Sequence, residues 1–251
     1  MKKKIWITGA SSGIGRALAI KFSKEGWQVA ASARRENLLN ELNKNNSNIY
    51  SFPLDVKDEK SVKNVFQNII EKFETLDICV FATGIHDPEA EKKLSSEKIR
   101  EIMETNFFGT LNCIMAVNSF FRERKNGHIS IVSSVAGYRG LPDASGYCAS
   151  KSALTSLAES IYFDFKRHNV RVSLVSPGFI KTPMTDKNKF PMPMIKSPEF
   201  AAEKMFIGLT KKNAFEIHFP LAFTMIMKLL KIMPNWLYFL LVKKGMKTVK
   251  Y

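Results

Sequence analysis

The residues with the clearest chemical potential are a tyrosine and a lysine, Tyr147 and Lys151, in the segment Tyr-Cys-Ala-Ser-Lys. On an α-helix their spacing of four places both side chains on one face, one turn apart. A phenol has an ordinary pKa of about 10, and a nearby ammonium favours the phenolate. Proton exchange near neutral pH needs that pKa to fall by about three units, or roughly 4 kcal/mol of differential stabilisation. The pair therefore predicts an acid–base site, although the same spacing also occurs on solvent-exposed helices.

A serine, Ser134, precedes the pair by thirteen residues and follows the short apolar run Ile129–Val132. A hydroxyl at the end of a strand can donate a hydrogen bond to an oxygen on which negative charge develops. Taken alone, Ser134 is equally well interpreted as a turn residue. Its significance depends on the elements that position it near Tyr147.

Short apolar runs and amphipathic stretches alternate along the chain. The apolar runs predict seven strands, at Ile5–Thr8, Val29–Ala33, Ile49–Phe52, Ile78–Ala82, Ile129–Val132, Val170–Val175 and Phe215–Phe219. The amphipathic stretches predict helices that include Ile14–Lys24, Glu59–Lys72, Ile99–Phe121 and Ala153–Lys166. Strands that are apolar on both faces and alternate with helices are typical of a parallel sheet. We predict an α/β fold, with one doubly wound Rossmann-type domain over residues 1–220 and a C-terminal extension over residues 221–251. Its sheet has seven strands, is mostly parallel and carries helices on both faces.

Length and composition agree with one domain of this kind. The chain has 251 residues, of which 45% are apolar and 24% charged, as in ordinary globular proteins. Cys79, Cys113 and Cys148 have no metal-ligand spacing and predict free thiols in a reducing compartment. Only three apolar residues follow Met1–Lys4 before Thr8, too few for a secretory signal, so we expect a cytoplasmic protein.

The net charge of +15 is unusual and is partly concentrated at the C-terminal end. No acidic residue follows Glu216, whereas six lysines do, so the segment after Glu216 holds +6 and the rest of the chain +9. Such a balance suits anionic lipid, an acidic carrier protein or a lysine-rich solvated surface. No basic groove with interleaved aromatic residues or recognition helix is evident, so nucleic acid is not a predicted partner.

A glycine-rich turn, Thr8-Gly-Ala-Ser-Ser-Gly-Ile-Gly15, follows the first predicted strand and leads directly into a predicted helix. Gly9, Gly13 and Gly15 allow a tight turn and close approach of the backbone to a phosphate. The N–H groups and positive dipole end of the helix favour a pyrophosphate at the same place. Between a strand and a helix, the turn predicts a dinucleotide site.

The end of the second strand predicts which dinucleotide binds. An acidic residue there would hold the ribose 2′-hydroxyl of NAD, but this chain has Arg34 and Arg35. Guanidinium groups suit a 2′-phosphate, and without such a ligand the helix dipole disfavours cations at this position. We therefore predict NADP. Asp55, after the third strand, is a candidate contact for the adenine; the alternative is an N-cap for the helix at Glu59.

Taken together, these motifs resemble the short-chain dehydrogenase/reductase family of NAD(P)-dependent oxidoreductases. The resemblance covers about residues 4–219. It rests on the glycine turn Thr8–Gly15, Asn106, Ser134, Tyr147 with Lys151, and Pro177-Gly178, in this order along the chain. The pieces are weak one by one, but their joint pattern is highly specific.

The resemblance implies a role for each matching residue. Tyr147 would donate a proton to a carbonyl, Ser134 would hydrogen-bond the substrate oxygen, and Lys151 would lower the pKa of Tyr147 and hold the nicotinamide ribose. Asn106 would anchor a water of the proton relay, and Thr182 would contact the nicotinamide carboxamide. The implied cofactor-binding residues are Gly9, Ser11, Ser12, Gly13, Ile14, Gly15, Arg34, Arg35, Asp55, Val56, Ala82, Gly84, Tyr147, Lys151, Pro177, Gly178, Ile180 and Thr182.

Two features lie outside this pattern. After the fourth strand the family commonly has Asn-Asn-Ala-Gly, whereas this chain has Phe81-Ala-Thr-Gly84, which lacks the hydrogen bonds of the two asparagines. Gly84 is retained, so the backbone can still approach the cofactor closely. The histidines have no ligand-like spacing and are interpreted as surface residues, so no metal site is predicted: His86, His128, His168 and His218.

The segment between Pro183 and Pro198 covers the substrate according to the resemblance. Its apolar residues would form an adaptable inner face: Met184, Phe190, Met192, Met194 and Ile195. The alternative is a packed surface loop. An apolar substrate is therefore favoured only slightly by this segment.

The C-terminal extension differs most from the family pattern. It is strongly apolar from Leu221 to Val242, but no uninterrupted run reaches the ~18 residues of a membrane span. At about 100° per residue, its polar residues fall on one stripe roughly 60° wide: Thr224, Lys228, Lys231 and Asn235. Pro234 is expected to end or kink this helix before a second apolar segment at Trp236. A wide apolar face with a cationic end fits a helix on a membrane surface; burial against the domain or a second subunit is the alternative.

These observations predict an NADP-dependent oxidoreductase that transfers a hydride between the nicotinamide and an apolar or lipid-derived carbonyl or alcohol substrate. The other expected partner is a membrane surface, contacted peripherally through residues 222–251, and the resemblance implies a homo-oligomer. Two alternatives stay open. One is a 3-oxoacyl-carrier-protein reductase, whose acidic partner would complement the basic surface. The other is a non-catalytic NADP-binding regulator, against which the complete Ser134, Tyr147 and Lys151 set argues.

Overall fold

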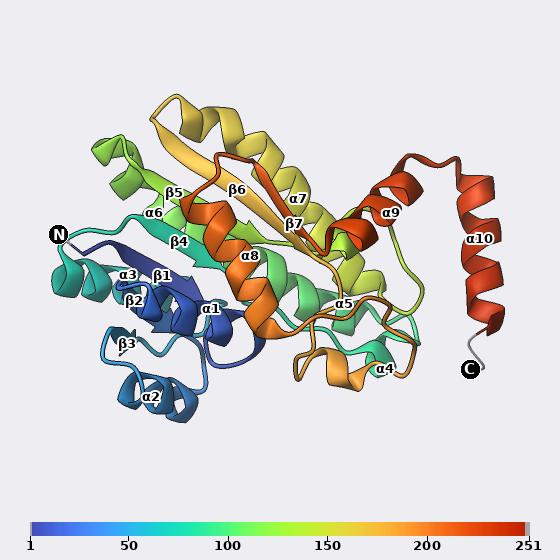
Figure 1. Cartoon of the computed structure of the whole chain (residues 1–251), viewed down its shortest axis with the longest axis horizontal. Coiled ribbons are helices and arrows are strands. Elements are labelled where there is room, and N and C mark those ends of the chain that lie inside the picture. The colour runs from blue at the N-terminus through green and yellow to red at the C-terminus, as the bar shows by residue number, and fades with distance from the viewer. Residues whose placement is uncertain (1, 249–251) are drawn as a thin grey trace.

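The computed structural model describes residues 2–248, and its centre is a single parallel sheet (Figure 1). The seven strands are β1 (Lys4–Thr8), β2 (Gln28–Ser32), β3 (Ile49–Ser51), β4 (Ile78–Phe81), β5 (Gly127–Val132), β6 (Val170–Pro177) and β7 (Glu216–Phe219). All neighbouring strands are parallel, which confirms the predicted α/β fold. The sheet was predicted to be mostly parallel and is parallel throughout.

Helices connect the strands and flank the sheet. They are α1 (Gly13–Lys24), α2 (Glu36–Lys44), α3 (Glu59–Phe73), α4 (Pro88–Glu91), α5 (Ser96–Met103), α6 (Gly109–Arg124), α7 (Ser145–Lys166), α8 (Pro198–Thr210), α9 (Leu221–Ile232) and α10 (Asn235–Thr248). Two 3₁₀ turns, η2 (Val135–Gly137) and η3 (Thr185–Lys187), and a π-helical segment, η1 (Glu104–Phe108), complete the elements.

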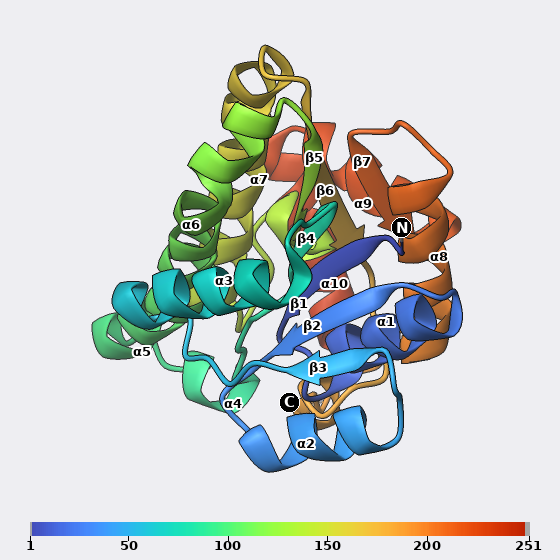
Figure 2. The ribbon, with the colours of Figure 1, turned by 90° about the vertical axis from the view of Figure 1, so that its left-hand side faces the viewer.

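The strand order is β3-β2-β1-β4-β5-β6-β7, so the direction of winding reverses between β1 and β4 (Figure 2). In such sheets a crevice forms at the carboxyl ends of the two strands beside the reversal. Here those ends lead into the glycine turn after Thr8 and the loop after Phe81. The topology therefore brings these two distant segments together.

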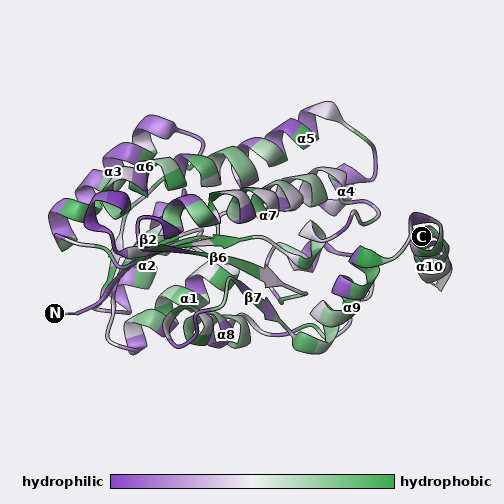
Figure 3. Ribbon diagram, turned by 90° about the horizontal axis from the view of Figure 1, so that it is seen from above, coloured by the Kyte–Doolittle hydropathy of each residue, from purple (hydrophilic) through white to green (hydrophobic). Residues whose placement is uncertain are grey.

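Side chains alternate across the sheet and build one apolar core on each face. Ile5 and Ile7 of β1 belong to the core under α1, α2 and α8, whereas Trp6 belongs to the opposite core under α3, α6 and α7. Figure 3 shows the two helical layers on either side of the sheet. Burial on both faces explains why the strands are recognisable in the sequence as continuous apolar runs.

The prediction of one regular α-helix over Ile99–Phe121 is wrong. The segment consists of α5, the π-helical segment η1 and α6, so the backbone hydrogen bonding changes register around Asn106. Such π-helical turns insert one residue into a helix and are frequent at functional sites. The predicted helix at Ala153–Lys166 is also too short, because α7 begins at Ser145 and includes Tyr147 and Lys151.

The polar stripe of α9 faces the domain. Thr224 is fully buried, with its hydroxyl 2.7 Å from Nδ1 of His218, and Nζ of Lys228 lies 2.5 Å from the carboxylate of Glu216 on β7. Phe223 is buried as well. The side chains on the outer face are large, apolar and exposed: Leu221, Met225, Ile226, Leu229 and Ile232. The alternative prediction of burial against this domain is wrong for these outer residues.

Helix α10 lies beyond α9, apart from the sheet (Figures 1 and 3). The hydroxyl of Tyr238 donates a hydrogen bond to the carbonyl of Gly140, and the Arg139 guanidinium lies 4.0 Å from the Tyr238 ring centroid. Among the α10 side chains that the structure describes, the large exposed apolar ones are Trp236, Phe239, Leu240 and Leu241. Within residues 2–248, no helix combines the length and hydrophobicity needed to cross a membrane.

Candidate active site

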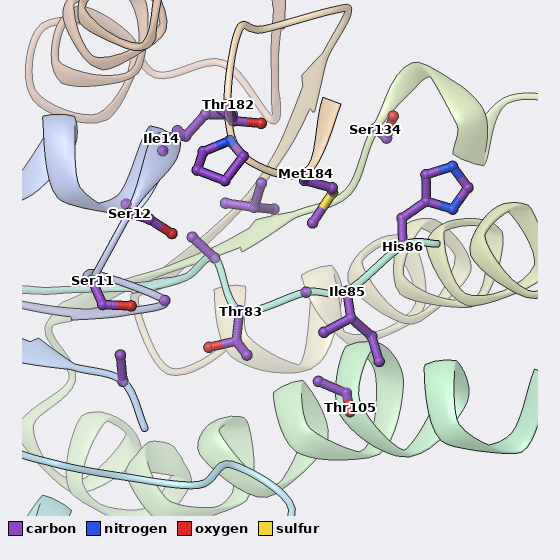
Figure 4. A pocket seen from close by; sticks show the side chains of 18 of the residues that line it. Ser11, Ser12, Ile14, Thr83, Ile85, His86, Thr105, Ser134, Thr182 and Met184 are labelled. Atoms are coloured by element: carbon purple, nitrogen blue, oxygen red, sulfur yellow. The ribbon is translucent and has the colours of Figure 1, made fainter. Parts of the chain in front are cut away.

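A cavity of about 470 Å³ opens at the carboxyl ends of the strands, at the reversal between β1 and β4 (Figure 4). It is lined by the turn after β1, the ends of β2 and β3, the loop after β4, and residues of α7 and of the segment after β6. Every residue predicted to bind the cofactor lines this cavity. The structure thus brings together segments that are spread over more than 170 residues.

The glycine turn after β1 is sterically required. Gly9 has φ 71°, and a Cβ at this position would lie 2.8 Å from the carbonyl oxygen of Ala82. A Cβ at Gly15 would lie 2.4 Å from the carbonyl oxygen of Gly9. Glycine therefore lets the turn pack against the loop after β4 and against the start of α1. Ser12 is the N-cap of α1, and the first turn of this helix contains no acidic residue, so an anion is favoured there.

The arginine side chain at the end of β2 reaches the glycine turn. The guanidinium of Arg35 donates hydrogen bonds to Ser11 Oγ at 2.8 Å and to Ser12 Oγ at 2.7 Å. Arg34 and Arg35 are both exposed and line the cavity. The side of the cavity nearest β2 is therefore cationic, as a phosphate on the ribose requires.

Asp55 and Val56 lie after β3 on the same side of the cavity. The helix α3 is capped by Asp58, whose carboxylate accepts hydrogen bonds from the backbone N–H groups of Lys60 and Ser61. The alternative interpretation of Asp55 as the N-cap of this helix is therefore wrong. Its carboxylate instead accepts a hydrogen bond from the backbone N–H of Lys57 at 3.1 Å, which fixes it at the cavity edge.

Tyr147 and Lys151 both point into the cavity from the first turns of α7. Nζ of Lys151 lies 5.7 Å from the centroid of the Tyr147 ring and donates a hydrogen bond to the carbonyl of Val132 at 2.9 Å. Lys151 is nearly completely buried, and this burial lowers its pKa to about 8. The ammonium is therefore held in place but is less stable than that of an exposed lysine.

The surroundings of Tyr147 raise the pKa of its hydroxyl group, whereas the sequence predicted a lowered pKa. Burial raises the pKa of Tyr147 to about 12, and a hydrogen bond with Ser134 opposes this shift only partly. Burial is the largest influence on this pKa, and Lys151 is not among the groups that shift it.

Ser134 lies at the end of β5, where the chain enters η2. Its Oγ accepts a hydrogen bond from the backbone N–H of Ala136 at 3.1 Å, and the side chain lines the cavity. Figure 4 shows Ser134 on the same side of the cavity as His86. The neighbouring Ser133 holds α7 in place, because its Oγ donates a hydrogen bond to the carbonyl of Lys151 at 2.9 Å. Both serines line the cavity, and Ser133 in addition attaches α7 to the end of β5.

Asn106 does not line the cavity. It is fully buried in η1, and its carboxamide accepts from the backbone N–H of Ile85 at 2.7 Å and donates to the carbonyl of Ile85 at 3.0 Å and to Ser150 Oγ at 3.0 Å. These bonds join the loop after β4 to α7. Asn106 therefore fixes the backbone that directly follows the Phe81-Ala-Thr-Gly84 segment.

The end of β6 brings Pro177, Gly178, Ile180 and Thr182 to the cavity. Thr182 lies opposite the glycine turn, because a Cβ at Gly13 would be 3.0 Å from its Cγ2. Gly178 contacts the C-terminal extension, since a Cβ there would lie 2.7 Å from Cδ1 of Phe223 on α9. The cavity wall and α9 are thus in direct contact.

The segment after Pro183 contributes less apolar surface than predicted. Met184 lines the cavity, together with Thr185 and Lys187. Phe190 instead packs against Phe179, with ring centroids 5.9 Å apart. Met192 lies away from the cavity, and Met194 and Ile195 are exposed. The predicted apolar inner face is therefore wrong except for Met184.

The histidines differ from the predicted surface residues. His86 lines the cavity, and its side chain is 11% exposed. His128 is buried, with Nε2 2.9 Å from Ser173 Oγ. The sequence carries no periodic or spacing signal for His86, because it lies in the loop after β4. Other cavity residues that sequence reasoning missed are Ala33, Leu54, Thr83, Ile85, Thr105, Val132, Ser133, Pro183, Thr185 and Lys187.

Comparisons with known proteins agree with this geometry. The sequence profile of the family described as short chain dehydrogenase matches residues 3–191. An uncharacterized oxidoreductase of Myxococcus xanthus is 34% identical over 236 residues, covering 92% of this chain and 93% of that protein. The 3-oxoacyl-[acyl-carrier-protein] reductase FabG of Thermotoga maritima is 30% identical over 223 residues, covering 83% and 91%.

Solved structures give the same result for the fold. The structure of ElxO with NADP bound has a TM-score of 0.76 and 26% identity, covering 87% of this chain and 98% of that chain. Among other similar structures, several hold NADP or NADPH and one holds NAD, so both kinds of cofactor occur among proteins of this architecture. By its sequence, its sheet topology and the residues around its cavity, the chain belongs to the short-chain dehydrogenase/reductase family of oxidoreductases.

Proposed function

We propose that the protein is an NADP-dependent reductase that converts a ketone or aldehyde to an alcohol, or catalyses the reverse reaction. The observation that carries this proposal is one 470 Å³ cavity that holds Ser134, Tyr147 and Lys151 together with the glycine turn and two arginines. Hydride arriving at a carbonyl carbon places negative charge on the oxygen, and hydroxyl donors aimed at this oxygen stabilise the transition state.

Each residue has a defined task in this proposal. The bound nicotinamide supplies the hydride. The Tyr147 hydroxyl donates the proton to the substrate oxygen, and Ser134 Oγ donates a hydrogen bond to the same oxygen. The Lys151 ammonium, fixed by the Val132 carbonyl, stabilises the developing phenolate and holds the ribose. Asn106 acts indirectly, by fixing the Ile85 backbone and, through Ser150, the first turns of α7.

Preference for NADP over NAD rests on the two arginines. Arg34 and Arg35 provide guanidinium groups at the place where the ribose 2′-phosphate would lie, and this wall has no carboxylate until Asp55. The hydroxyls of Ser11 and Ser12 orient the Arg35 guanidinium through short hydrogen bonds. A phosphate bound to such a guanidinium has both charge and directed hydrogen bonds in its favour.

We further propose that residues 1–220 form the catalytic domain and that residues 221–251 attach it to an anionic membrane surface. The large exposed apolar residues described on α9 and α10 support this assignment, as do the five lysines that follow Glu216 besides its ion-pair partner Lys228, with no acidic residue among them. Apolar side chains beside lysines bind anionic lipid through both the hydrophobic effect and charge. Because Phe223 touches Gly178, a membrane at α9 would lie close to the cavity, which favours a lipid-derived substrate.

Membrane attachment is tested with sedimentation of vesicles. We expect the wild-type protein to bind phosphatidylcholine vesicles that contain anionic phosphatidylserine, and to bind them less tightly at high salt. The double variant M225D/L229D should lose this binding. Leu94→Asp is the matched control, because Leu94 is 82% exposed but lies on the main domain. Equal binding by M225D/L229D and the wild type would show that α9 is not the membrane contact.

A second candidate is a reductase of 3-oxoacyl groups on an acidic carrier protein. The 30% identity to the FabG enzyme and the net charge of +15 favour it. Higher activity on carrier-bound than on free 3-oxoacyl substrates, lost at high salt, would distinguish it from the first proposal. Both proposals describe the same chemistry at Tyr147.

The function is tested by a screen for NADPH oxidation with aliphatic, aromatic and lipid-derived carbonyl compounds, with and without anionic vesicles. We expect turnover with at least one class of ketone or aldehyde, and a lower KM for lipid substrates when vesicles are present. Binding of NADPH without turnover of any carbonyl or alcohol would instead support the non-catalytic regulator.

A further inference from the structure

His86 lies beside the proposed proton donor although no motif points to it. It follows β4, lines the cavity, and its ring centroid is 4.5 Å from that of Tyr147, with an angle of 34° between the planes. Its ring therefore covers one face of Tyr147. Figure 4 shows that the His86 side chain and Ser134 lie on the same side of the cavity. A substrate that reaches Ser134 and Tyr147 must pass close to this ring.

A buried carboxylate fixes the orientation of His86. The side chain of Glu91, on α4, is 1% exposed, and its Oε1 lies 2.8 Å from Nδ1 of His86. Its other oxygen, Oε2, accepts hydrogen bonds from the backbone N–H groups of Gly146 at 2.7 Å and of Tyr147 at 3.1 Å. One carboxylate therefore ties the imidazole to the backbone of the proposed proton donor.

Glu91 also replaces a missing helix cap. The N-cap of α7 is Ala144, whose side chain cannot accept a hydrogen bond, so the first N–H groups of this helix need another acceptor. A carboxylate is favoured at this end of the helix by the dipole. Because Glu91 supplies the acceptor from 55 residues away, α4, His86 and the start of α7 are held as one unit.

The hydrogen bond to Glu91 determines which nitrogen of His86 is free. A carboxylate accepts hydrogen bonds, so the proton lies on Nδ1 and Nε2 is the nitrogen left for another partner. Among residues 2–248, Nε2 of His86 has no hydrogen-bond partner. In neutral imidazole this nitrogen accepts a hydrogen bond, and in imidazolium it donates one. A substrate hydroxyl group can donate to the one form and accept from the other, so it satisfies both.

We propose that His86 is a specificity-determining residue that binds a hydroxyl group of the substrate near its reacting carbonyl, and that Glu91 positions His86 for this contact. This inference rests on the proposed reductase function and adds a substrate class to it, the hydroxy ketones. A site with a fixed polar group discriminates strongly against an analogue that lacks the matching group, because the polar group then stays unpaired.

The test compares isosteric substrates that differ in one hydroxyl group. The pairs are 1-hydroxy-2-butanone with 3-pentanone, and 4-hydroxy-2-butanone with 2-pentanone, each assayed by NADPH oxidation. We expect the wild type to favour the hydroxy ketone of at least one pair. His86→Phe keeps a ring against Tyr147 but loses both nitrogens. It should lower the ratio of kcat/KM values for that pair about tenfold or more, because the ratio reports the lost contact with the substrate hydroxyl and cancels effects that are common to both ketones.

Two further variants complete the experiment. His86→Gln keeps a polar end and should retain more of the preference than His86→Phe, and it decides the question if His86→Phe does not fold or bind NADPH. His168→Phe is the matched control, since His168 lies outside the cavity. An unchanged ratio in the His86 variants, or a wild type without preference for either hydroxy ketone, would overturn this inference. It would leave the reductase function intact if the plain ketones are reduced. A wild type that turns over no carbonyl compound would overturn both.

Discussion

The ammonium of Lys228 on α9 lies 2.5 Å from the carboxylate of Glu216 on β7, and this contact joins the C-terminal extension to the sheet. Glu216 also accepts a hydrogen bond from Ser176 Oγ at 2.8 Å and one from the Tyr138 hydroxyl. The polar side of α9 is thus used for attachment to the domain. As a result, its apolar side is left on the outside.

Loss of this ion pair should loosen the extension. We expect Lys228→Met to lower the free energy of unfolding by about 1 kcal/mol, since the pair is partly exposed and therefore partly screened. It should also make the chain after Phe219 more sensitive to protease. Urea unfolding and limited proteolysis measure the two effects. Lys243→Met, on exposed α10, is the control and should change neither.

The same site predicts an acid dependence. Burial alone would raise the pKa of Glu216, but hydrogen bonds from Lys228, Tyr138 and Ser176 outweigh it and leave the pKa below its ordinary value of 4.5. Because the folded-state pKa is lowered, the charged group stabilises the fold above pH 4.5, and this contribution is lost as the pH falls through the folded-state pKa. The difference in melting temperature between wild type and Glu216→Gln should therefore be largest near pH 7 and shrink below about pH 4.5. A difference that is constant from pH 7 to pH 3 would contradict this.

Removal of the Tyr147 hydroxyl should abolish proton donation without affecting the cavity. We expect Tyr147→Phe to lower kcat by about 10²- to 10⁴-fold, the usual contribution of a positioned general acid. The dissociation constant for NADPH, measured by fluorescence titration, should stay within about twofold. If Tyr147→Phe reduced every accepted carbonyl as fast as the wild type, another group would have to be the proton donor.

Burial of Lys151 predicts how activity depends on alkaline pH. Its pKa is lowered to about 8, so the ammonium is lost as the pH rises through this value. The kcat/KM for carbonyl reduction reports groups of the free enzyme and should fall above about pH 8. Circular dichroism over the same range controls for unfolding. A profile that stays flat to pH 10 would show that the charge of Lys151 is not needed.

Cofactor preference should depend on Arg35. We expect Arg35→Ala to weaken NADPH binding by about 10- to 100-fold, which corresponds to about 1.4–3 kcal/mol for charge-assisted hydrogen bonds. NADH binding should change less than about twofold, because NADH lacks the 2′-phosphate. The control is Arg16→Ala, which removes an arginine paired with Glu41 outside the cavity. Equal losses for NADPH and NADH would show that Arg35 acts on the turn and not on the phosphate.

The sequence alone was sufficient for the sheet and for most of the cavity wall. Strands that are buried on both faces are continuous apolar runs, and the glycine turn and the tyrosine–lysine spacing are local patterns. These features depend on neighbours in the chain, so they are visible without a structure. All seven predicted strands follow from such patterns. The cofactor residues were implied by the family resemblance that these motifs carry, and all of them line the cavity.

Features that depend on contacts between distant segments could not be predicted from local sequence patterns. The polar positions on α9 predicted a helix with one polar side. Only the position of Glu216 in the folded chain shows that this polar side faces the domain and not the solvent. His86 resembled a surface histidine until folding placed Glu91 and the start of α7 beside it. The pKa of Tyr147 likewise follows from burial. The sequence by itself determined the fold and which side chains are available for chemistry. The tertiary structure decided which groups surround these side chains and whether they are buried, because desolvation and long-range hydrogen bonds exist only once the chain has folded.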